Sequence, residues 1–470
     1  MNRPLDDVGS ISDARTGDST PRFKRRFMAR LIAVLVGGMI LDGYILGILG
    51  PITGLIREDA RLDDFWIGAI AAAPLFGIFV GSPLAGWATD KFGRKPMFIV
   101  DMGLFLVASA LQFFVSSGDA AAVQLFAIRF LMGVAIGGEY AIGWPLMSEF
   151  APPKLRGRLL GVTVVAWYVG FMIAFVVGTS MQQAGVPWRI ILGSSTLLAL
   201  VLFLARLGLP ESPSWLITKG RRDEALVVAR RYIGSSEMHE SITQEIDLRM
   251  IQEARAAKEQ RVLRSASFGT LFSPGYWRAT LFTAGFWLCA VTPYFAIATF
   301  AVEVLKKYGL DNEWVSGVGL SALAAAGVVT SVLLVDKVGR RVLTVPTQWA
   351  ATVLLLVIGL WSGAPPALVL TMFLAFSFIN AMYNTLTQIY PSELFPSEVR
   401  GIGMGFAAAI SRIGAALGTF ALPWSMTNLG ASTTMVIAAV IALAGALLSQ
   451  WLAPETKGKT LAETAQGFSH

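Results

Sequence analysis

Hydrophobic residues in this chain are gathered into long blocks that short polar segments separate. The first four blocks are Met28–Gly50, Trp66–Thr89, Met97–Val115 and Val123–Gly143. Each has about the length that a helix needs to cross a hydrocarbon core of about 30 Å. Because lipid offers the backbone no hydrogen-bond partner, blocks of this kind are expected to form helices.

Eight further blocks follow the first four, and the alternating pattern of a transmembrane β-barrel is absent. The chain is therefore predicted to be an all-α membrane protein with twelve transmembrane helices. The eight blocks run roughly over Arg158–Ser180, Trp188–Leu209, Arg278–Val302, Trp314–Val335, Val342–Trp361, Ala367–Tyr390, Gly401–Leu422 and Ser432–Trp451.

Charged residues are few, and they are placed unevenly. They make up 15% of the chain, against about 25% in soluble domains, while 54% of the residues are hydrophobic. The net charge of +7 comes largely from Lys and Arg in the loops after the second, fourth and eighth blocks, not from a patch for nucleic acid. By the positive-inside rule, both termini are predicted to be cytoplasmic. We thus expect a multi-pass protein of the inner (plasma) membrane that contacts the lipid bilayer and binds no nucleic acid.

The two halves of the chain carry similar loop motifs in the same order. DKFGRKP (Asp90–Pro96), after the second block, matches DKVGRR (Asp336–Arg341), after the eighth. SEFAPPKLRGR (Ser148–Arg158), after the fourth block, matches SELFPSEVRG (Ser392–Gly401), after the tenth, at an offset of 244 residues. Internal duplication of helix units is the design of many secondary transporters, which bind substrate near the membrane midplane between the repeats.

A polar segment rich in Arg, Glu and Ala separates the first six blocks from the last six, and parts of it have a helical pattern. This organisation predicts five parts of the chain. They are a cytoplasmic N-terminal tail (1–27), an N-terminal six-helix bundle (28–209), a cytoplasmic linker with short helices (210–270), a C-terminal six-helix bundle (271–453) and a cytoplasmic C-terminal tail (454–470).

Several of these motifs resemble those of a known family. GWATDKFGRKP resembles the loop signature of the major facilitator superfamily. RFLMGVAIGGEYAIGWPLMSEFAPPKLRGR and PESPSWLITKGRRDEA resemble the sugar-porter group and its relatives, the metabolite–proton symporters. The resemblance covers all twelve spans. It implies two pseudo-symmetric six-helix bundles and transport of a small molecule by alternating access.

The duplicated loop motifs carry charges that suit a gate at the cytoplasmic face. We expect Asp90, Arg94 and the N-terminal end of the eleventh span to form a network that holds the halves together and breaks when the inner side opens. The alternative is that these charges only fix the topology. The predicted gate residues are Asp90, Arg94, Glu149, Arg156, Asp336, Arg340, Glu393 and Arg400.

Four ionisable residues stand out within the predicted spans, where a charge is costly unless it faces a cavity or a partner. They are Asp42, Arg129, Glu139 and Arg412. At about 1.5 Å of rise per residue, Asp42 lies about 21 Å from the inner end of its helix and Arg129 about 9 Å from the outer end of its own. Their depths nearly coincide, and the resemblance implies that the first and fourth spans both line the cavity of the N-terminal half, so we expect the two to meet as a pair.

Such a pair suits proton coupling, because burial favours the protonated carboxyl group and a nearby arginine favours the carboxylate. The resemblance adds that aromatic-acid–proton symporters have a first-span motif like DGYD. Asp42 matches its first Asp, whereas Ile45 replaces the second. The alternative for Asp42 and Arg129 is a static salt bridge. Glu139 is a further candidate for the proton site, with a gate or packing role as its alternative.

Arg412 lies about 17 Å into the eleventh span, among small residues in AAAISRIGAALG. An anionic substrate is one partner for its guanidinium, and an acidic residue or backbone carbonyls of the C-terminal half are the alternative. Polar and aromatic residues on the fifth, seventh and tenth spans are predicted to line the pocket, with packing and interhelical hydrogen bonding as their alternative. These residues are Trp167, Tyr168, Trp287, Tyr294, Asn380, Tyr383, Asn384 and Gln388.

Together these features predict a secondary active transporter that couples uptake of a small organic metabolite to protons. An organic or aromatic acid is favoured as substrate because of Arg412 and Arg129, and a sugar or polyol is the alternative. A non-transporting nutrient sensor is the alternative of another class. We expect no enzyme activity, no cofactor and no metal, since the sequence has no metal-ligand cluster and no phosphate-binding loop. We also expect a monomer.

Overall fold

The computed structural model describes residues 21–150, 156–232, 268–361, 363–395 and 399–458. Within these ranges it contains helices and no strand. Twelve helices are long and apolar enough to cross a membrane. The prediction of an all-α protein with twelve spans is therefore confirmed.

The first six spans form one bundle, which we call the N bundle. Its first and last spans are each made of two helices, because the chain leaves the helix at Ile48 and at Ser194. The N bundle consists of α1 (Pro21–Gly47), α2 (Leu49–Ala60), α3 (Asp64–Phe92), α4 (Arg94–Leu111) with the 3₁₀ turn η2 (Gln112–Phe114), α5 (Asp119–Phe150), α6 (Arg156–Gln183), α7 (Trp188–Gly193) and α8 (Ser195–Arg206).

The last six spans form the C bundle, in which the helix is again interrupted, at Phe300 and at Thr385. The C bundle consists of α12 (Trp277–Thr299), α13 (Ala301–Lys306), the π-helical η5 (Trp314–Gly319), α14 (Leu320–Val338), α15 (Arg340–Leu360), α16 (Pro366–Asn384), α17 (Leu386–Leu394), α18 (Arg400–Asn428) and α19 (Gly430–Leu452). The segment that joins the two bundles in the sequence contains α9 (Pro213–Thr218), α10 (Arg222–Tyr232) and the 3₁₀ helix η4 (Phe268–Phe272).

The predicted spans agree with the helices to within about seven residues, except at the end of the first. That span was predicted to end at Gly50, but α2 continues to Ala60. The end of α2 carries charged residues, which are more typical of a loop than of a membrane span. One of them, Arg57, pairs with Asp64 at 2.6 Å.

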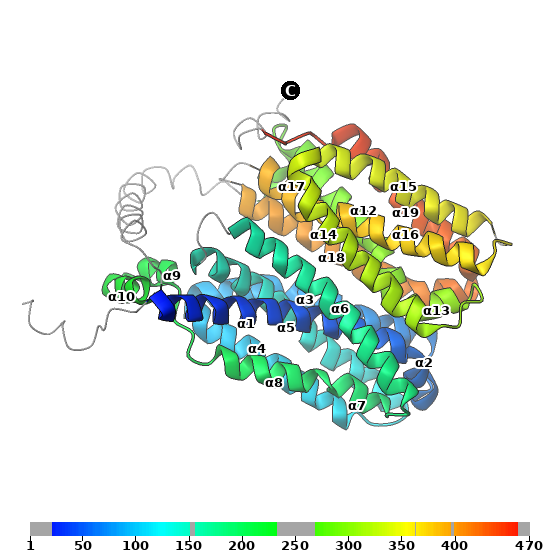
Figure 1. Ribbon diagram of the computed structural model, residues 1–470, viewed down its shortest axis with the longest axis horizontal. Helices are drawn as coiled ribbons and strands as arrows, with labels where there is room; N and C mark the ends of the chain where they lie inside the picture. Colours follow the sequence, from blue (N-terminus) through cyan, green and yellow to red (C-terminus); the bar gives the residue numbers. More distant parts are fainter. Residues whose placement is uncertain (1–20, 151–155, 233–267, 362, 396–398, 459–470) are drawn as a thin grey trace, which may run out of the picture.

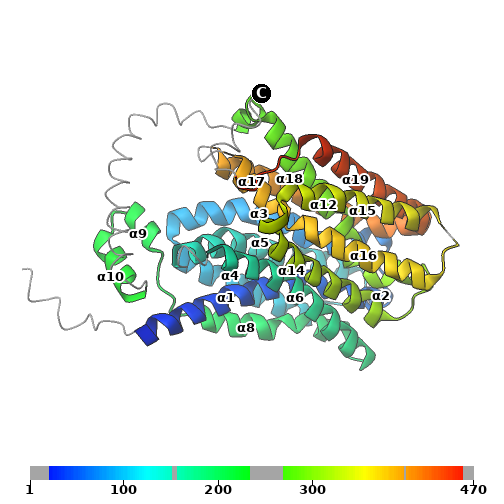
Figure 2. The same cartoon turned by 45° about the horizontal axis from the view of Figure 1, so that its top comes forward.

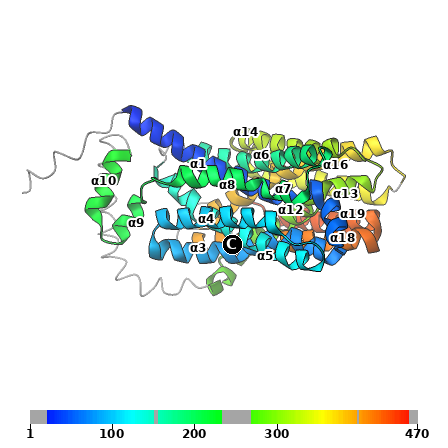
Figure 3. The ribbon, with the colours of Figure 1, turned by 90° about the horizontal axis from the view of Figure 1, so that it is seen from below.

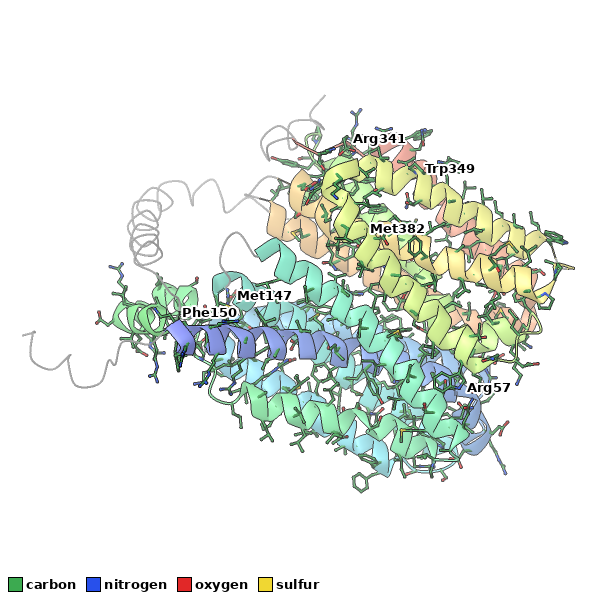
Figure 4. The ribbon with its side chains drawn as sticks, in the orientation of Figure 1. Arg57, Met147, Phe150, Arg341, Trp349 and Met382 are labelled. Atoms are coloured by element: carbon green, nitrogen blue, oxygen red, sulfur yellow. The ribbon has the colours of Figure 1, made fainter. Side chains whose placement is uncertain are left out.

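The two bundles lie side by side, with α9 and α10 beyond the end of the N bundle (Figure 1). Figures 2 and 3 show α9 and α10 beyond the same end from two other directions, and in Figure 3 the N bundle lies in front of the C bundle. Because the number of spans is even, α1 begins and α19 ends at the same face, which we call the terminal face. Figure 4 shows Arg341 near the terminal face and Arg57 at the far end of the molecule, on the side that we call the opposite face.

Small residues allow the helices to approach closely, as is usual for helices that pack within membranes. A Cβ atom at Gly133 of α5 would collide with the Pro74 carbonyl oxygen of α3, and one at Gly170 of α6 would collide with the Ile40 carbonyl oxygen of α1. The glycines of the hydrophobic blocks therefore set the spacing of these helix pairs.

The bundles also touch each other near the opposite face. A Cβ atom at Gly68 of α3 would collide with the Phe420 carbonyl oxygen of α18. The ring of Phe65 meets the ring of Phe420 edge-on at 5.4 Å. Trp314 Nε1 donates to Gln183 Oε1 at 3.1 Å, again from one bundle to the other. The structure is thus closed at the opposite face.

Candidate functional site

A cavity lies between the bundles, and both bundles contribute its walls. Its volume is about 70 Å³, below the several hundred Å³ of a typical ligand pocket, so its walls must move apart to admit a metabolite. Helices α5, α6, α12, α17 and α18 line it, together with the break between α16 and α17. The lining residues are Tyr140, Val164, Trp167, Tyr168, Trp287, Val291, Phe295, Asn384, Thr385, Thr387, Gln388 and Arg412.

Six of the nine residues predicted to bind substrate are among these lining residues: Trp167, Tyr168, Trp287, Asn384, Gln388 and Arg412. A seventh, Tyr294, packs against Tyr168 with the two rings tilted and their centroids 5.9 Å apart. The remaining two point into the C bundle. Asn380 donates to the Ala290 carbonyl at 3.2 Å and to the Tyr383 hydroxyl at 2.5 Å.

The break at Thr385 explains why the predicted polar stripe divides. Asn380 precedes the break and is fully buried, whereas Asn384 is at the end of α16 and reaches the other bundle. Its Nδ2 donates to the Tyr168 hydroxyl at 3.1 Å. Gln388 follows the break and lines the cavity. The cavity wall is therefore connected across the two bundles by a polar contact.

Arg412 is the cationic residue of this cavity. Its guanidinium lies 5.6 Å from the ring centre of Tyr140, which belongs to the other bundle. Within the part of the chain that the structure describes, its side chain has no ion pair or hydrogen bond. The acidic partner named as an alternative is thus not seen there, and the charge is available to a solute.

Asp42 lies on α1 and is completely buried. Neither of its carboxyl oxygens has a hydrogen-bond partner among the described residues. Its charge interacts with those of Glu139, Asp101, Arg206 and Arg412. Asp42 thus occupies the region between the cavity and a group of buried charges in the N bundle.

The structure does not bring Asp42 and Arg129 together. Arg129 is also completely buried, but it donates to the Ile70 carbonyl at 3.1 Å and to the Ile45 carbonyl at 3.2 Å. The depth estimate assumed helices that enter at Met28 and at Val123 without tilt. Helix α1 begins earlier, at Pro21, and Arg129 reaches the α1 backbone at Ile45, three residues after Asp42, instead of the Asp42 side chain.

Two buried charges were missed by the sequence analysis. Arg206 Nη2 is 2.5 Å from Glu139 Oε2, and Arg206 Nη1 is 3.3 Å from Asp101 Oδ2. Asp101 and Arg206 lie near the terminal-face ends of predicted spans, where charged side chains commonly reach water. In the structure, Arg206 and Glu139 have no exposed surface, and Asp101 is 7% exposed.

The predicted gate residues lie at the terminal face. In the C bundle, Arg340 pairs with Asp336 at 3.1 Å and with Glu393 at 3.0 Å. In the N bundle, the Asp90 carbonyl accepts from Trp215 Nε1 at 3.1 Å. The side chains of Glu149, Arg156 and Arg400 lie outside the described residues. The expected network across the halves, which needs the start of α18, therefore stays a prediction.

A pair of carboxylates repeats the same contact in both bundles. Glu211 Oε1 accepts from the backbone N–H groups of Arg94 at 2.9 Å and Lys95 at 3.1 Å. Glu455 accepts from those of Arg340 and Arg341, each at 3.0 Å. Each carboxylate thus caps the start of a helix, α4 or α15, and meets the positive end of its dipole.

Glu455 illustrates the electrostatics of this cap. Burial acts to raise its pKa, but the N–H donors of Lys457, Arg340, Arg341 and Thr456 outweigh burial and hold the pKa below its ordinary value. A carboxylate with a lowered pKa stabilises the folded state above the pKa that it has when unfolded. This contribution is lost as the pH falls through the lowered pKa.

Comparisons with known proteins agree with this architecture. The family described as Sugar (and other) transporter matches residues 31–468. The chain is 34% identical over 438 residues to the inner membrane metabolite transport protein YgcS of Escherichia coli K12, covering 93% of each. It is 27% identical over 458 residues to the major myo-inositol transporter IolT of Bacillus subtilis 168, covering 94% of each.

Among solved structures, the chain resembles the proton:xylose symporter XylE of the major facilitator superfamily. The TM-score is 0.75 at 19% sequence identity, covering 94% of this chain and 99% of the other. At this identity the likeness concerns the fold. The predicted arrangement of twelve spans in two six-helix bundles is therefore confirmed as the fold of that superfamily.

Proposed function

We propose that this protein moves a small polar metabolite together with protons by alternating access. The chain belongs to the family of sugar (and other) transporters, so it is a multi-pass secondary transporter and not an enzyme. The terminal face is then cytoplasmic, as the distribution of Lys and Arg favours, and the protein belongs to the inner membrane. The observation that carries the proposal is the cavity between the bundles, whose walls combine one cation with hydrogen-bonding and aromatic side chains.

The proposed substrate is an organic anion that Arg412 binds. A guanidinium within a mostly apolar wall, without an ion pair in contact with it in the described chain, favours a carboxylate, which it can bind through two parallel hydrogen bonds. Trp167, Tyr168 and Trp287 supply flat apolar surface nearby. This combination suits a compact acid with an aromatic or otherwise apolar body. Arg129 no longer supports this choice, because its Nε and Nη2 donate to backbone carbonyls and it does not line the cavity.

A sugar or polyol is the second candidate. Asn384, Thr387 and Gln388 offer donors and acceptors for hydroxyl groups at the same cavity. The names of two relatives point the same way, since IolT is a myo-inositol transporter and XylE a proton:xylose symporter. Stacking of a sugar ring on Trp167 or Trp287 is compatible with this candidate.

Asp42 is the proposed proton-coupling residue. A buried carboxylate without a hydrogen-bond donor is costly while it is charged, and binding a proton removes that cost. Asp42 also interacts electrostatically with Arg412, so the charge of a bound substrate acts on both residues. Proton binding and substrate binding are therefore linked in this proposal through one pair of opposite charges.

The closed opposite face corresponds to one end state of the transport cycle. Transport requires the contacts of Gly68 and Phe65 with Phe420 to separate while the terminal face closes. We propose that the gate residues Asp336, Arg340 and Glu393, with their counterparts in the N bundle, stabilise the second end state.

The test is a ligand screen followed by transport. Purified protein is heated with benzoate, shikimate, xylose and myo-inositol, and each compound that raises Tm is then tested in vesicles for uptake with and without a proton gradient. Stabilisation by acids and accumulation driven by protons are the expected results. Stabilisation by the polyols alone would replace the acid proposal with the second candidate, and uptake indifferent to the proton gradient would remove the coupling.

A further inference from the structure

A group of four buried ionisable residues lies in the N bundle, away from the wall of the cavity. Arg206 of α8 holds Glu139 of α5 at 2.5 Å and Asp101 of α4 at 3.3 Å. Asp42 of α1 completes the group, because its charge interacts with all three. We call Asp101, Glu139 and Arg206 the buried triad. Its members come from three helices, so its geometry depends on how the whole bundle packs.

The sequence makes room for the carboxyl groups of the triad with glycines. A Cβ atom at Gly138 would lie 2.5 Å from Asp101 Oδ1, and one at Gly38 would collide with Glu139 Oε1. The ring of Phe98 lies 3.6 Å from the guanidinium carbon of Arg206, whose Nη1 also donates to the Phe98 carbonyl at 3.1 Å. Phe98 therefore holds the guanidinium of Arg206 in place, and the two carboxyl groups converge on that guanidinium.

The charges of this group do not balance when all its acids are ionised. Three carboxylates then face one guanidinium in a buried region, where Asp101 alone of the four residues has any exposed surface. Glu139 Oε1 and both oxygens of Asp42 have no donor among the described residues. The carboxyl groups of Asp101 and Glu139 converge on one guanidinium, at 3.3 Å and 2.5 Å, and two buried carboxyl groups that share a site repel each other unless one of them carries a proton.

The neighbouring helices add little charge that could compensate. Arg412 of α18 acts on Asp42 from the cavity side, and Tyr140 follows Glu139 on α5. On the terminal side, Arg30 of α1 donates to the Ala205 and Leu207 carbonyls and is exposed. Within the described chain, Arg206 is thus the cation that contacts the carboxyl groups of the triad.

The repeat shows that the triad is not required by the architecture. The loop motifs place Asp336 at the position of Asp90, and Glu393 at that of Glu149. Carried into the spans, the same offsets put uncharged residues of the C bundle at the positions of the triad. These residues are Thr347, Tyr383 and Gln450. The C bundle therefore forms the same six-helix fold without these charges.

We propose that Asp101 and Glu139 share one proton and form a relay between Asp42 and the terminal face. Asp101 lies seven residues from the start of α4 at Arg94, which is about 10 Å along the helix from the terminal face. Glu139 lies deeper, next to Tyr140 of the cavity wall, so the pair leads from the depth of the cavity toward the terminal face. Asp42 passes its proton to the Asp101–Glu139 pair as that pair releases its own to water at the terminal face. Arg206 positions the two carboxyl groups and balances one negative charge throughout.

This inference rests on the proposed proton coupling, but its first test needs no substrate. Infrared spectra of the purified full-length protein, recorded in the Asp42→Asn background, report protonated carboxyl groups through their carbonyl stretch. Asp101→Asn and Glu139→Gln are each expected to remove the same band, because the remaining carboxylate is then paired with Arg206 and ionised. Asp311→Asn, which changes an exposed loop carboxyl group, is the matched control and should leave the band in place.

Thermal stability separates a relay from a structural ion cluster. Asp101→Asn reduces the excess of negative charge, so the relay predicts a Tm equal to or above that of the parent protein. A structural cluster predicts a loss of Tm for either carboxyl variant and no carbonyl band to remove. A band lost in only one of the two variants would place the proton on a single residue and overturn the sharing.

Transport then separates this inference from the proposed function. With benzoate and myo-inositol as probes in vesicles, Asp101→Asn should lose accumulation driven by protons and keep exchange of the probe. Accumulation at the wild-type ratio in this variant would overturn the relay and leave the proposed function intact. If the wild-type protein couples neither probe to protons, the proposed function loses its support, and the infrared result still decides whether the pair shares a proton.

Discussion

Replacing Arg412 tests the most specific part of the proposed function. The guanidinium is part of the cavity wall, lies 5.6 Å from the Tyr140 ring and has no ion pair in the described chain. If an anionic substrate is the partner of this guanidinium, Arg412→Ala removes the cation that the substrate binds and leaves the rest of the wall unchanged. Arg412→Lys retains the charge but loses the planar fork that binds a carboxylate through two hydrogen bonds.

The expected magnitude depends on the charge of the solute. Removing one partner of a buried, hydrogen-bonded charge pair costs about 2–5 kcal/mol. With about 1.4 kcal/mol per tenfold, an acid should bind about 30-fold more weakly or worse to Arg412→Ala. A polyol loses an ordinary hydrogen bond of about 0.5–1.5 kcal/mol, which corresponds to about tenfold or less. Arg412→Lys should lie between the wild-type protein and Arg412→Ala for the acid.

Isothermal titration of each variant with benzoate and with myo-inositol measures these differences directly. The Tm of each variant without solute is measured as well, because Arg412→Ala also removes a cation–π contact worth about 0.5–2 kcal/mol. That loss lowers Tm equally with either solute and does not change the ratio of their affinities. Equal affinity of folded Arg412→Ala and wild-type protein for every acid that binds would refute the assignment, and Arg412 would then have a structural role.

Asp42→Asn should abolish accumulation driven by protons and preserve exchange, as uptake and counterflow in vesicles can measure; unchanged accumulation would exclude Asp42 from coupling. Glu211→Gln and Glu455→Gln each weaken two charge-assisted hydrogen bonds by about 1 kcal/mol in total, so each should lower Tm by about 2–4 °C. A lower Tm for only one of the two variants would contradict the repeated cap. Gly68→Val should push α3 from Phe420 and lengthen spin-label distances between the bundles at the opposite face; unchanged distances would show that this contact does not close that face.

The helices were predictable because hydrophobic length is a local property of the sequence. The end of the first span was not predictable, because the charged residues around Arg57 are typical of a loop. The ion pair of Arg57 with Asp64 is visible only in three dimensions. Trp167, Asn384 and Arg412 were found because polar or aromatic groups in apolar blocks favour a cavity. Their role in binding remains a prediction.

The pairing of buried charges could not be predicted in the same way. Depth along a helix does not determine which face a residue presents or how the helices tilt. Asp42 and Arg129 have similar estimated depths, yet Arg129 is bound by carbonyl groups. Asp101 and Arg206 were overlooked although the cost of burying a charge applies equally to them. They lie closer to the span ends, and only the packing of α4 and α8 shows that their side chains are buried.

The caps at Glu211 and Glu455 have a consequence for the order in which the protein is assembled. Each cap joins the segment that follows the sixth span of its bundle to the start of the third span, so it fastens the end of a bundle to its middle. The N bundle can therefore fasten itself as soon as Glu211 has been synthesised, before any span of the C bundle exists. Domains generally fold as units, with the N-terminal one first during synthesis. A completed N bundle would then provide the surface, including Gly68, against which the C bundle packs as it folds.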